Sequence, residues 1–137
     1  MADSSLAIQG DESSISKSVL IWNILSVLIL GGMIFFSLNP TYFIKHIISR
    51  VPYSDPAMHI FSFGILMFCY CQAWKQNKIR MILAVCLLLF GLGLEILQVT
   101  LWGGAFEIED SFANILGVGL GYLMSRVWNC YRLHSTF

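Results

Sequence analysis

The chain alternates between long apolar runs and short polar segments, and the lengths of the apolar runs indicate the fold. Four runs each hold about 20 residues, the number that an α-helix needs to cross a bilayer. They cover residues 19–38, 56–74, 81–100 and 111–128. Asn39-Pro40 suits the end of the first helix, and Pro56 suits the first turn of the second. The pattern predicts an all-α polytopic membrane protein with four transmembrane helices in a compact bundle.

The polar segments predict the parts of the chain outside the bilayer. Residues 1–18 are polar and rich in serine, which predicts a disordered tail, and residues 129–137 form a second tail. The segment before the first run lacks the basic start of a signal peptide, and the run itself is too long for one, so we expect a helix in the mature protein. The loop 39–54 contains "YFIKHIISRVPY", which predicts a short interfacial helix.

Composition supports a membrane as the solvent and excludes several other classes. The chain is 57% hydrophobic and 12% charged, whereas soluble domains have about 45–50% apolar and about 25% charged residues. The formal net charge is zero, so the chain lacks the basic surface that nucleic-acid binding requires. The four cysteines have no metal-finger spacing, which predicts buried thiols without a disulfide framework. We expect no cofactor and no metal ion.

The distribution of basic residues predicts the orientation in the membrane. If the N-terminus lies inside, six of the eight basic residues are cytoplasmic: Lys17, Lys75, Lys78, Arg80, Arg126 and Arg132. The loop between the third and fourth runs has no basic residue and contains Glu107, Glu109 and Asp110. Because cytoplasmic loops carry the excess of Lys and Arg, both termini are predicted to be cytoplasmic.

Three of the predicted helices carry polar side chains near their outer ends. The pairs are Asp55 with His59, Glu95 with Gln98, and Asp110 with Asn114. At a rise of 1.5 Å per residue, the members inside the spans lie roughly 5–10 Å below the outer boundary. An ionisable group at the centre of a membrane helix costs roughly 2.5–3.5 kcal/mol, so each needs a partner. We therefore predict one polar pocket on the outer side, in which Glu95 is paired with His59.

Simpler roles remain open for several of these residues. Asp55 and Asp110 are placed to cap the second and fourth helices. Gln98 and Asn114 could serve as interhelical hydrogen bonds alone. These roles would not require a ligand.

Three stretches carry the polar residues in a fixed order within residues 50–125. They read "SDPAMHIFSF", "GLGLEILQ" and "GGAFEIEDSFANILGVGLG". Together they resemble the VanZ-like family of small bacterial integral membrane proteins. The positions that match the family motifs are Asp55, His59, Glu95, Gln98, Asp110, Asn114, Gly117 and Gly121. The two glycines, four residues apart, also predict a seam of close helix packing.

The chain departs from the family pattern at two positions. Pro56 stands where the family has a lysine, and Gly104 stands where it has an arginine. Both missing groups are basic and would lie at the outer mouth of the predicted pocket. Binding of an anionic headgroup at this mouth would therefore be weaker in this chain.

The resemblance implies a protein of the bacterial cell envelope, in the cytoplasmic membrane. Founding members of the family are linked to low-level resistance to glycopeptide antibiotics such as teicoplanin. No pair of nucleophile and base is evident in the sequence, which favours a non-catalytic protein. We expect its pocket to bind membrane lipids or a lipid-linked envelope precursor and to influence glycopeptide susceptibility, and a homo-oligomer is left open.

Two alternatives also remain open at this stage. The first is an intramembrane enzyme that acts on a lipid-linked phosphate or glycan, with His59 and Glu95 as acid and base. The missing basic residues count against it, because phosphoryl chemistry uses such groups to stabilise charge. The second is a small oligomeric transporter or proton relay through the same pair, although four spans are few for a carrier and no inverted repeat is visible.

Overall fold

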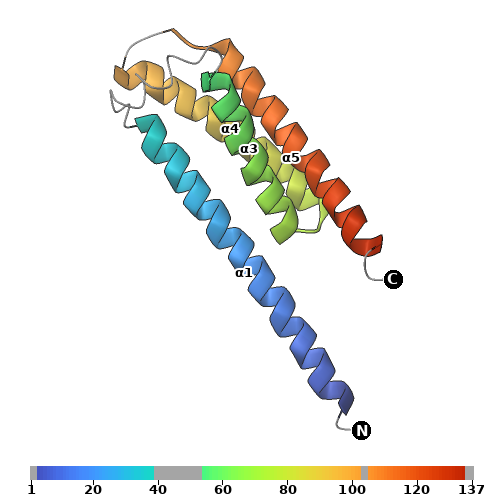
Figure 1. Cartoon of the computed structure of the whole chain (residues 1–137). Coiled ribbons are helices and arrows are strands. Elements are labelled where there is room, and N and C mark those ends of the chain that lie inside the picture. The colour runs from blue at the N-terminus through green and yellow to red at the C-terminus, as the bar shows by residue number, and fades with distance from the viewer. Residues whose placement is uncertain (1–2, 39–53, 103–104, 135–137) are drawn as a thin grey trace.

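The computed structural model describes residues 3–38, 54–102 and 105–134, and these form four α-helices (Figure 1). The helices are α1 (Asp3–Leu38), α3 (Ser54–Ala73), α4 (Asn77–Trp102) and α5 (Ile108–His134). The predicted all-α bundle of four helices is confirmed, and the described residues contain no strand. The predicted interfacial helix in the loop 39–54 lies outside the described residues, apart from Ser54 at the start of α3.

Three of the helices contain segments that are long and apolar enough to cross a membrane. These segments are Lys17–Ser37, Pro56–Ala73 and Asn77–Leu101. They agree with the first three predicted runs to within a few residues. The chain is thus a membrane protein.

α5 is not among these segments, because residues such as Asn114 and Arg126 lower its mean hydropathy. Apart from Arg126, its large exposed side chains are nevertheless apolar over the fourth predicted run: Phe112, Ile115, Leu116, Leu120, Leu123, Met124, Val127 and Trp128. Asn114 itself is buried. The surface that α5 presents outwards is therefore mainly apolar, as expected of a helix that faces lipid.

The structure differs from the prediction at both tails. α1 begins at Asp3, where a disordered tail is predicted over residues 1–18, and α5 continues to His134, within the tail predicted over residues 129–137. Extending a helix that has already formed costs far less than starting one, and residues 3–16 contain no proline to stop it. Both spans thus continue as helices beyond their apolar runs.

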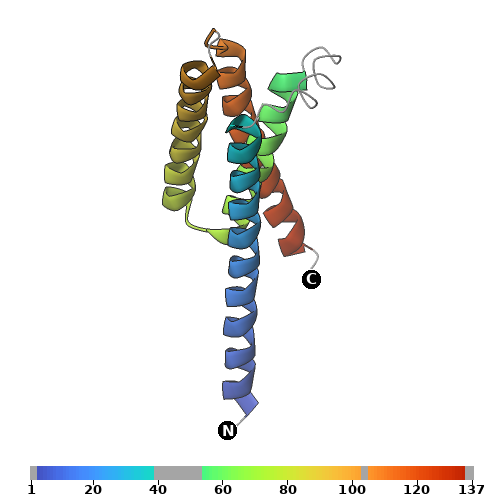
Figure 2. The ribbon, with the colours of Figure 1, turned by 90° about the vertical axis from the view of Figure 1, so that its left-hand side faces the viewer.

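The helices run in alternating directions, so that both termini lie towards the same end of the bundle (Figure 1). Figure 2 shows the connection from α3 to α4 at one end, and the start of α5 beside the end of α4 at the other. We call this second end the polar end, because it holds the predicted site residues. α3 contacts all three other helices, and its contact with α5 is the most extensive in the bundle.

The buried core centres on α3. Its fully buried side chains include Phe63, Leu66, Met67 and Cys71, packed with Leu87 of α4 and Val118 of α5. All four cysteines are free; Cys69 and Cys71 are buried, whereas Cys86 and Cys130 are exposed on the surface of the bundle. The prediction that the thiols are buried is therefore wrong for the last two, because their helix faces point outwards.

Glycines bring α3 and α5 into backbone contact. A Cβ atom on Gly117 would lie 2.6 Å from the carbonyl oxygen of Ile60, and one on Gly121 would overlap the carbonyl oxygen of Gly64. Such close approach is possible only where both helices lack bulky side chains. The first turns of α5 are consequently held against the first turns of α3, which places the polar residues of α5 beside His59.

Candidate functional site: a polar cluster around His59

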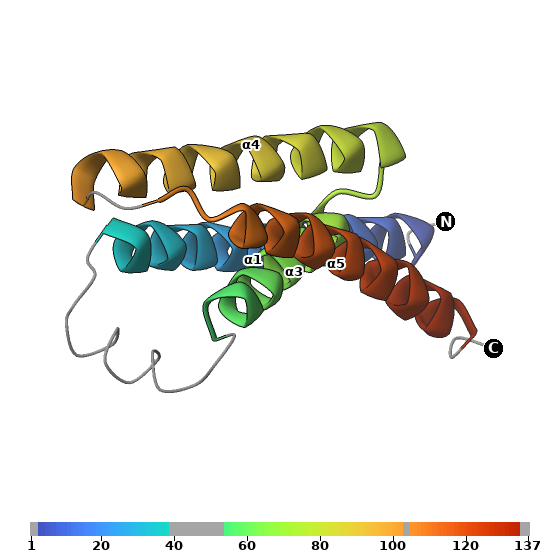
Figure 3. The same cartoon turned by 90° about the horizontal axis from the view of Figure 1, so that it is seen from above.

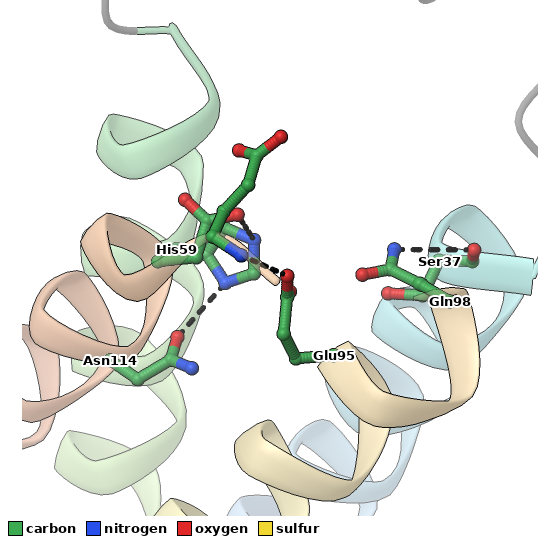
Figure 4. A network of polar contacts seen from close by, with 7 residues as sticks. Ser37, His59, Glu95, Gln98 and Asn114 are labelled. Atoms are coloured by element: carbon green, nitrogen blue, oxygen red, sulfur yellow. Dashed lines mark hydrogen bonds and ion pairs between the residues drawn. The ribbon is translucent and has the colours of Figure 1, made fainter. Parts of the chain in front are cut away.

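His59, in the second turn of α3, contacts two side chains of α5 (Figure 4). Its Nδ1 lies 2.9 Å from Oδ1 of Asn114, and its Nε2 lies 3.4 Å from Oδ2 of Asp110. Asp110 and Asn114 are four residues apart, so they stand on one face of α5 and reach the same imidazole. Asp110 lies within the first turn of α5, where its charge also complements the helix dipole.

The surroundings of His59 hold its ring in place. The ring stacks against Phe63, one turn further along α3, with centroids 6.3 Å apart and planes at 14°. The oxygens of Asn114 and Asp110 that face the two ring nitrogens can each accept a hydrogen bond from a ring N–H group. Asp110 and Asn114 are 7% and 4% exposed, while the His59 side chain keeps 26% of its surface. His59 is therefore the accessible member of a buried group.

Glu95 of α4 lies close to the start of α5 and is 7% exposed. Its Oε1 accepts a hydrogen bond of 3.0 Å from the backbone N–H of Glu107, and the Glu107 carbonyl accepts one of 3.1 Å from the N–H of Asp110. The predicted Glu95–His59 pair is thus wrong: no hydrogen bond or ion pair joins the two within the described residues. The glycine contact brings α5 rather than α4 within reach of His59.

The remaining predicted residues lie apart from this contact. Gln98 donates through Nε2 to the backbone carbonyl of Ser37 at 3.4 Å, so it links α4 to α1 (Figure 4). Asp55 is in the first turn of α3, and its side chain lies outside the described part of the structure. We define the polar cluster as His59, Glu95, Asp110 and Asn114.

Phe63 and Gly91 shape the polar cluster and are not among the predicted site residues. A Cβ on Gly91 would lie 2.6 Å from Nδ2 of Asn114 and 2.8 Å from Cζ of Phe63, so α4 leaves room for both groups at this point. Phe63 could have been found from its spacing of four residues after His59. Gly91 opens the stretch "GLGLEILQ" and lies four residues before Glu95, so the sequence places it on the polar face of α4, but its contacts with Phe63 and Asn114 depend on how three helices pack.

The described part of the polar end is acidic. It contains Glu95, Glu107, Glu109 and Asp110 and neither Lys nor Arg. Pro56, in place of the lysine of the family pattern, belongs to this region. Among the described residues, no group of three or more His, Cys, Asp or Glu side chains is arranged to hold a metal ion. The polar cluster can thus accept hydrogen bonds and attract positive charge.

Comparison with known proteins places this bundle in a family. The sequence pattern of the VanZ/LLP1 family matches residues 9–129, which include nearly all of the four helices. The chain belongs to the VanZ/LLP1 family. This confirms the resemblance to VanZ-like proteins that the three motifs indicate.

A curated relative outside the bacteria is also similar to this VanZ/LLP1 chain. An uncharacterised protein of the fission yeast Schizosaccharomyces pombe, C11E3.10, is 30% identical over 88 residues, which are 62% of this chain and 54% of that protein. The chain therefore matches about half the length of this relative. No solved structure matches the chain.

Proposed function

We propose that this VanZ/LLP1 protein is a non-catalytic membrane protein whose polar cluster binds the headgroup of a membrane lipid or of a lipid-linked envelope precursor. The observation that supports this proposal most is that His59 contacts both Asp110 and Asn114 while about a quarter of its side chain remains exposed at the polar end. A membrane protein rarely places an ionisable group at such a depth without a function. A headgroup at this end of the bundle would meet the exposed part of the ring.

The contacts of His59 favour binding over catalysis. A histidine that acts as a general base needs a ring nitrogen within reach of the substrate proton. Here both nitrogens already face protein oxygens. The ring would have to give up one of these contacts before it could accept a proton from a ligand, so the enzyme alternative receives no support from this geometry.

The charge of the polar end indicates the chemistry of the ligand. Four carboxylates without a neighbouring Lys or Arg among the described residues favour a headgroup that carries an amine or several hydroxyls over one that presents a bare phosphate. Ethanolamine phospholipids have such an amine, and lipid-linked glycans have such hydroxyls. The relative in a yeast favours a lipid that bacterial and eukaryotic membranes share.

The distribution of charged residues also indicates the membrane and the orientation of the protein. We infer that the protein lies in the cytoplasmic membrane of a bacterium with its polar end outwards, because the basic residues gather towards the opposite end of the helices. There the polar cluster would meet the headgroups of the outer leaflet. An effect on teicoplanin susceptibility would follow if the headgroup belongs to an envelope precursor.

The proposal is tested by the lipids that remain bound to the purified protein. Native mass spectrometry after reconstitution with equal amounts of ethanolamine and glycerol phospholipids should show preferential retention of the ethanolamine lipid. His59→Ala and Glu95→Ala should each remove this preference. Thr100→Ala is the matched control, because its hydroxyl at the same end of α4 bonds only to the Ile96 carbonyl of its own helix, at 2.7 Å. Equal retention of both lipids by the unmodified protein would contradict the proposal.

A susceptibility assay separates the two sources of the headgroup. If an envelope precursor is the ligand, expression of the protein should change the teicoplanin susceptibility of a sensitive bacterial host. The His59→Ala variant, at equal abundance in the membrane, should not. Unchanged susceptibility together with ethanolamine-lipid preference would assign the site to the phospholipid.

A further inference from the structure

A groove separates α1 from α4 near the middle of the bundle. It is lined by Leu30 of α1, Tyr70 of α3, and Leu83, Cys86, Leu87 and Phe90 of α4, and its volume is about 150 Å³. α1 packs mainly on α3. Its contact with α4 is the least extensive of the helix–helix contacts described. In Figure 3, α1 and α4 run nearly parallel to each other, with α4 along one edge of the bundle. The groove is therefore the place where two neighbouring helices are not packed together.

The position of the groove determines what can fill it. Its α4 residues lie in the interior of the apolar segment Asn77–Leu101, and exposed apolar side chains such as Leu89 surround it. At this depth the solvent is hydrocarbon, so lipid chains rather than water border the groove. Its volume is below the roughly 300–1,000 Å³ of ordinary small-molecule pockets. It has room for a segment of one chain and not for a whole compact ligand.

The face of α4 that lines the groove continues beyond it towards the polar end. Phe90, Leu94 and Gln98 follow each other at intervals of four residues. Gln98 then bridges to Ser37, so α1 and α4 meet again above the groove. Phe90, at the near edge of the groove, is eight residues or about 12 Å from Gln98, and Leu83, at its far edge, is fifteen residues or about 22 Å from Gln98. The hydrocarbon core is about 30 Å thick, so the groove lies around its middle.

We propose that this groove binds one acyl chain of a phospholipid. The assignment of that chain to the same lipid whose headgroup occupies the polar cluster rests on the proposed function. The acyl site itself rests on the apolar lining, the depth and the size of the groove. The protein would thus recognise a lipid at two points, one polar and one apolar.

Photo-crosslinking tests the acyl site directly. The full chain is reconstituted in bilayers that contain a phospholipid with a photoactivatable diazirine in one acyl chain, and the labelled residues are mapped by mass spectrometry. We expect Leu30, Cys86 and Phe90 to be labelled several-fold more than Val85, which is also exposed on α4 but on another face. Equal labelling of Val85 and the groove would show annular lipid only and would overturn the inference.

Two matched variants sharpen the test. Cys86→Trp fills the groove and should reduce labelling of Leu30 and Phe90 several-fold, whereas Val85→Trp places the same ring on the surface of the same helix and should leave it unchanged. Equal effects of the two variants would contradict an acyl site. Folding of both variants is checked by their monodisperse elution in detergent.

Repeating the labelling with ethanolamine and glycerol lipids, and with the His59→Ala variant, distinguishes this inference from the proposed function. Labelling of the groove that is the same for ethanolamine and glycerol lipids, and unchanged in His59→Ala, would refute the headgroup site while supporting the acyl site. A headgroup preference that His59→Ala removes, without selective labelling of the groove, would support the headgroup site and refute the acyl site.

Discussion

His59 joins α3 to α5 through two side chains, and the strength of each contact can be measured. The hydrogen bond between His59 and Asn114 is 2.9 Å long and shielded by Phe63. Side-chain hydrogen bonds between membrane helices contribute about 0.6 kcal/mol on average and at most about 1.7 kcal/mol. A double-mutant cycle with His59→Ala and Asn114→Ala, measured by unfolding in detergent, should give a coupling free energy in this range.

The control for this cycle pairs His59→Ala with Thr100→Ala. Thr100 bonds only within its own helix, so the two effects should add to within about 0.3–0.5 kcal/mol. A coupling of the His59–Asn114 pair no larger than that of the control pair would mean that the contact does not stabilise the bundle.

Glu95 holds the start of α5 through a single backbone amide. Glu95→Ala removes the acceptor of the Glu107 N–H, whereas Glu95→Gln keeps an oxygen in the same place. Hydrogen exchange of the Glu107 amide, followed by mass spectrometry, should become faster in Glu95→Ala and change little in Glu95→Gln. Equal exchange in Glu95→Ala and the unmodified protein would show that this hydrogen bond does not protect the amide.

At the scale of helices, the packing of α3 on α5 depends on positions where a methyl group has no room. Gly121→Ala would press its Cβ against the backbone of Gly64, which cannot move aside as a side chain can. Overpacking of this kind costs about 1–3 kcal/mol, so the free energy of unfolding in detergent should fall by this amount. The helices would also separate and weaken the contact between His59 and Asn114.

Gly119→Ala is the matched control on the same helix. A Cβ there meets no atom within 4 Å, and alanine favours a helix over glycine by up to about 1 kcal/mol. This variant should therefore be as stable as the unmodified protein or more so. Similar losses at both positions would contradict a packing seam at Gly121.

The turn between α3 and α4 is closed by Arg80, which is 5% exposed. Its Nε donates to the Trp74 carbonyl at 2.7 Å and its Nη2 to the Cys71 carbonyl at 2.8 Å. Carbonyls at a helix C-terminus lack partners within the helix, and hydrogen bonds to charged groups contribute about 1.5–3 kcal/mol. Arg80→Ala should lower the free energy of unfolding by at least this much, while Lys78→Ala, at an exposed position, should stay within about 0.5 kcal/mol. Comparable stability of the two variants would exclude this role for Arg80.

At the scale of the whole molecule, the four helices alternate in direction and bring both termini to the same end of the bundle, so both termini are predicted to lie on one side of the membrane. The basic residues at that end predict that this side is the cytoplasm. In a bacterial host, a fluorescent protein fused to either terminus should be fluorescent, and alkaline phosphatase fused to either terminus should be inactive. Active phosphatase at one terminus alone would mean an odd number of crossings and would contradict the four-helix topology.

Much of the whole molecule could be predicted from the order of residues. Hydropathy predicts four spans, and three of the helices contain segments apolar enough to cross a membrane; α5 falls short because polar residues such as Asn114 and Arg126 lower its mean hydropathy. The sequence also predicts that His59, Asp110 and Asn114 share one pocket with Asp55, Glu95 and Gln98. The structure joins the first three, ties Glu95 to the Glu107 amide, and turns Gln98 towards α1.

The sequence by itself determined the class of protein, its family and the apolar parts of its first three helices, because hydropathy and motif spacing are properties of the chain alone. The tertiary structure alone decided which of the polar residues meet. A residue's depth follows from its position in a span, but its partner depends on how each helix is rotated about its axis. That rotation follows from contacts between helices, above all from those of Gly117 and Gly121, which let α5 pack closely on α3. As a result, His59 contacts Asp110 and Asn114 rather than Glu95.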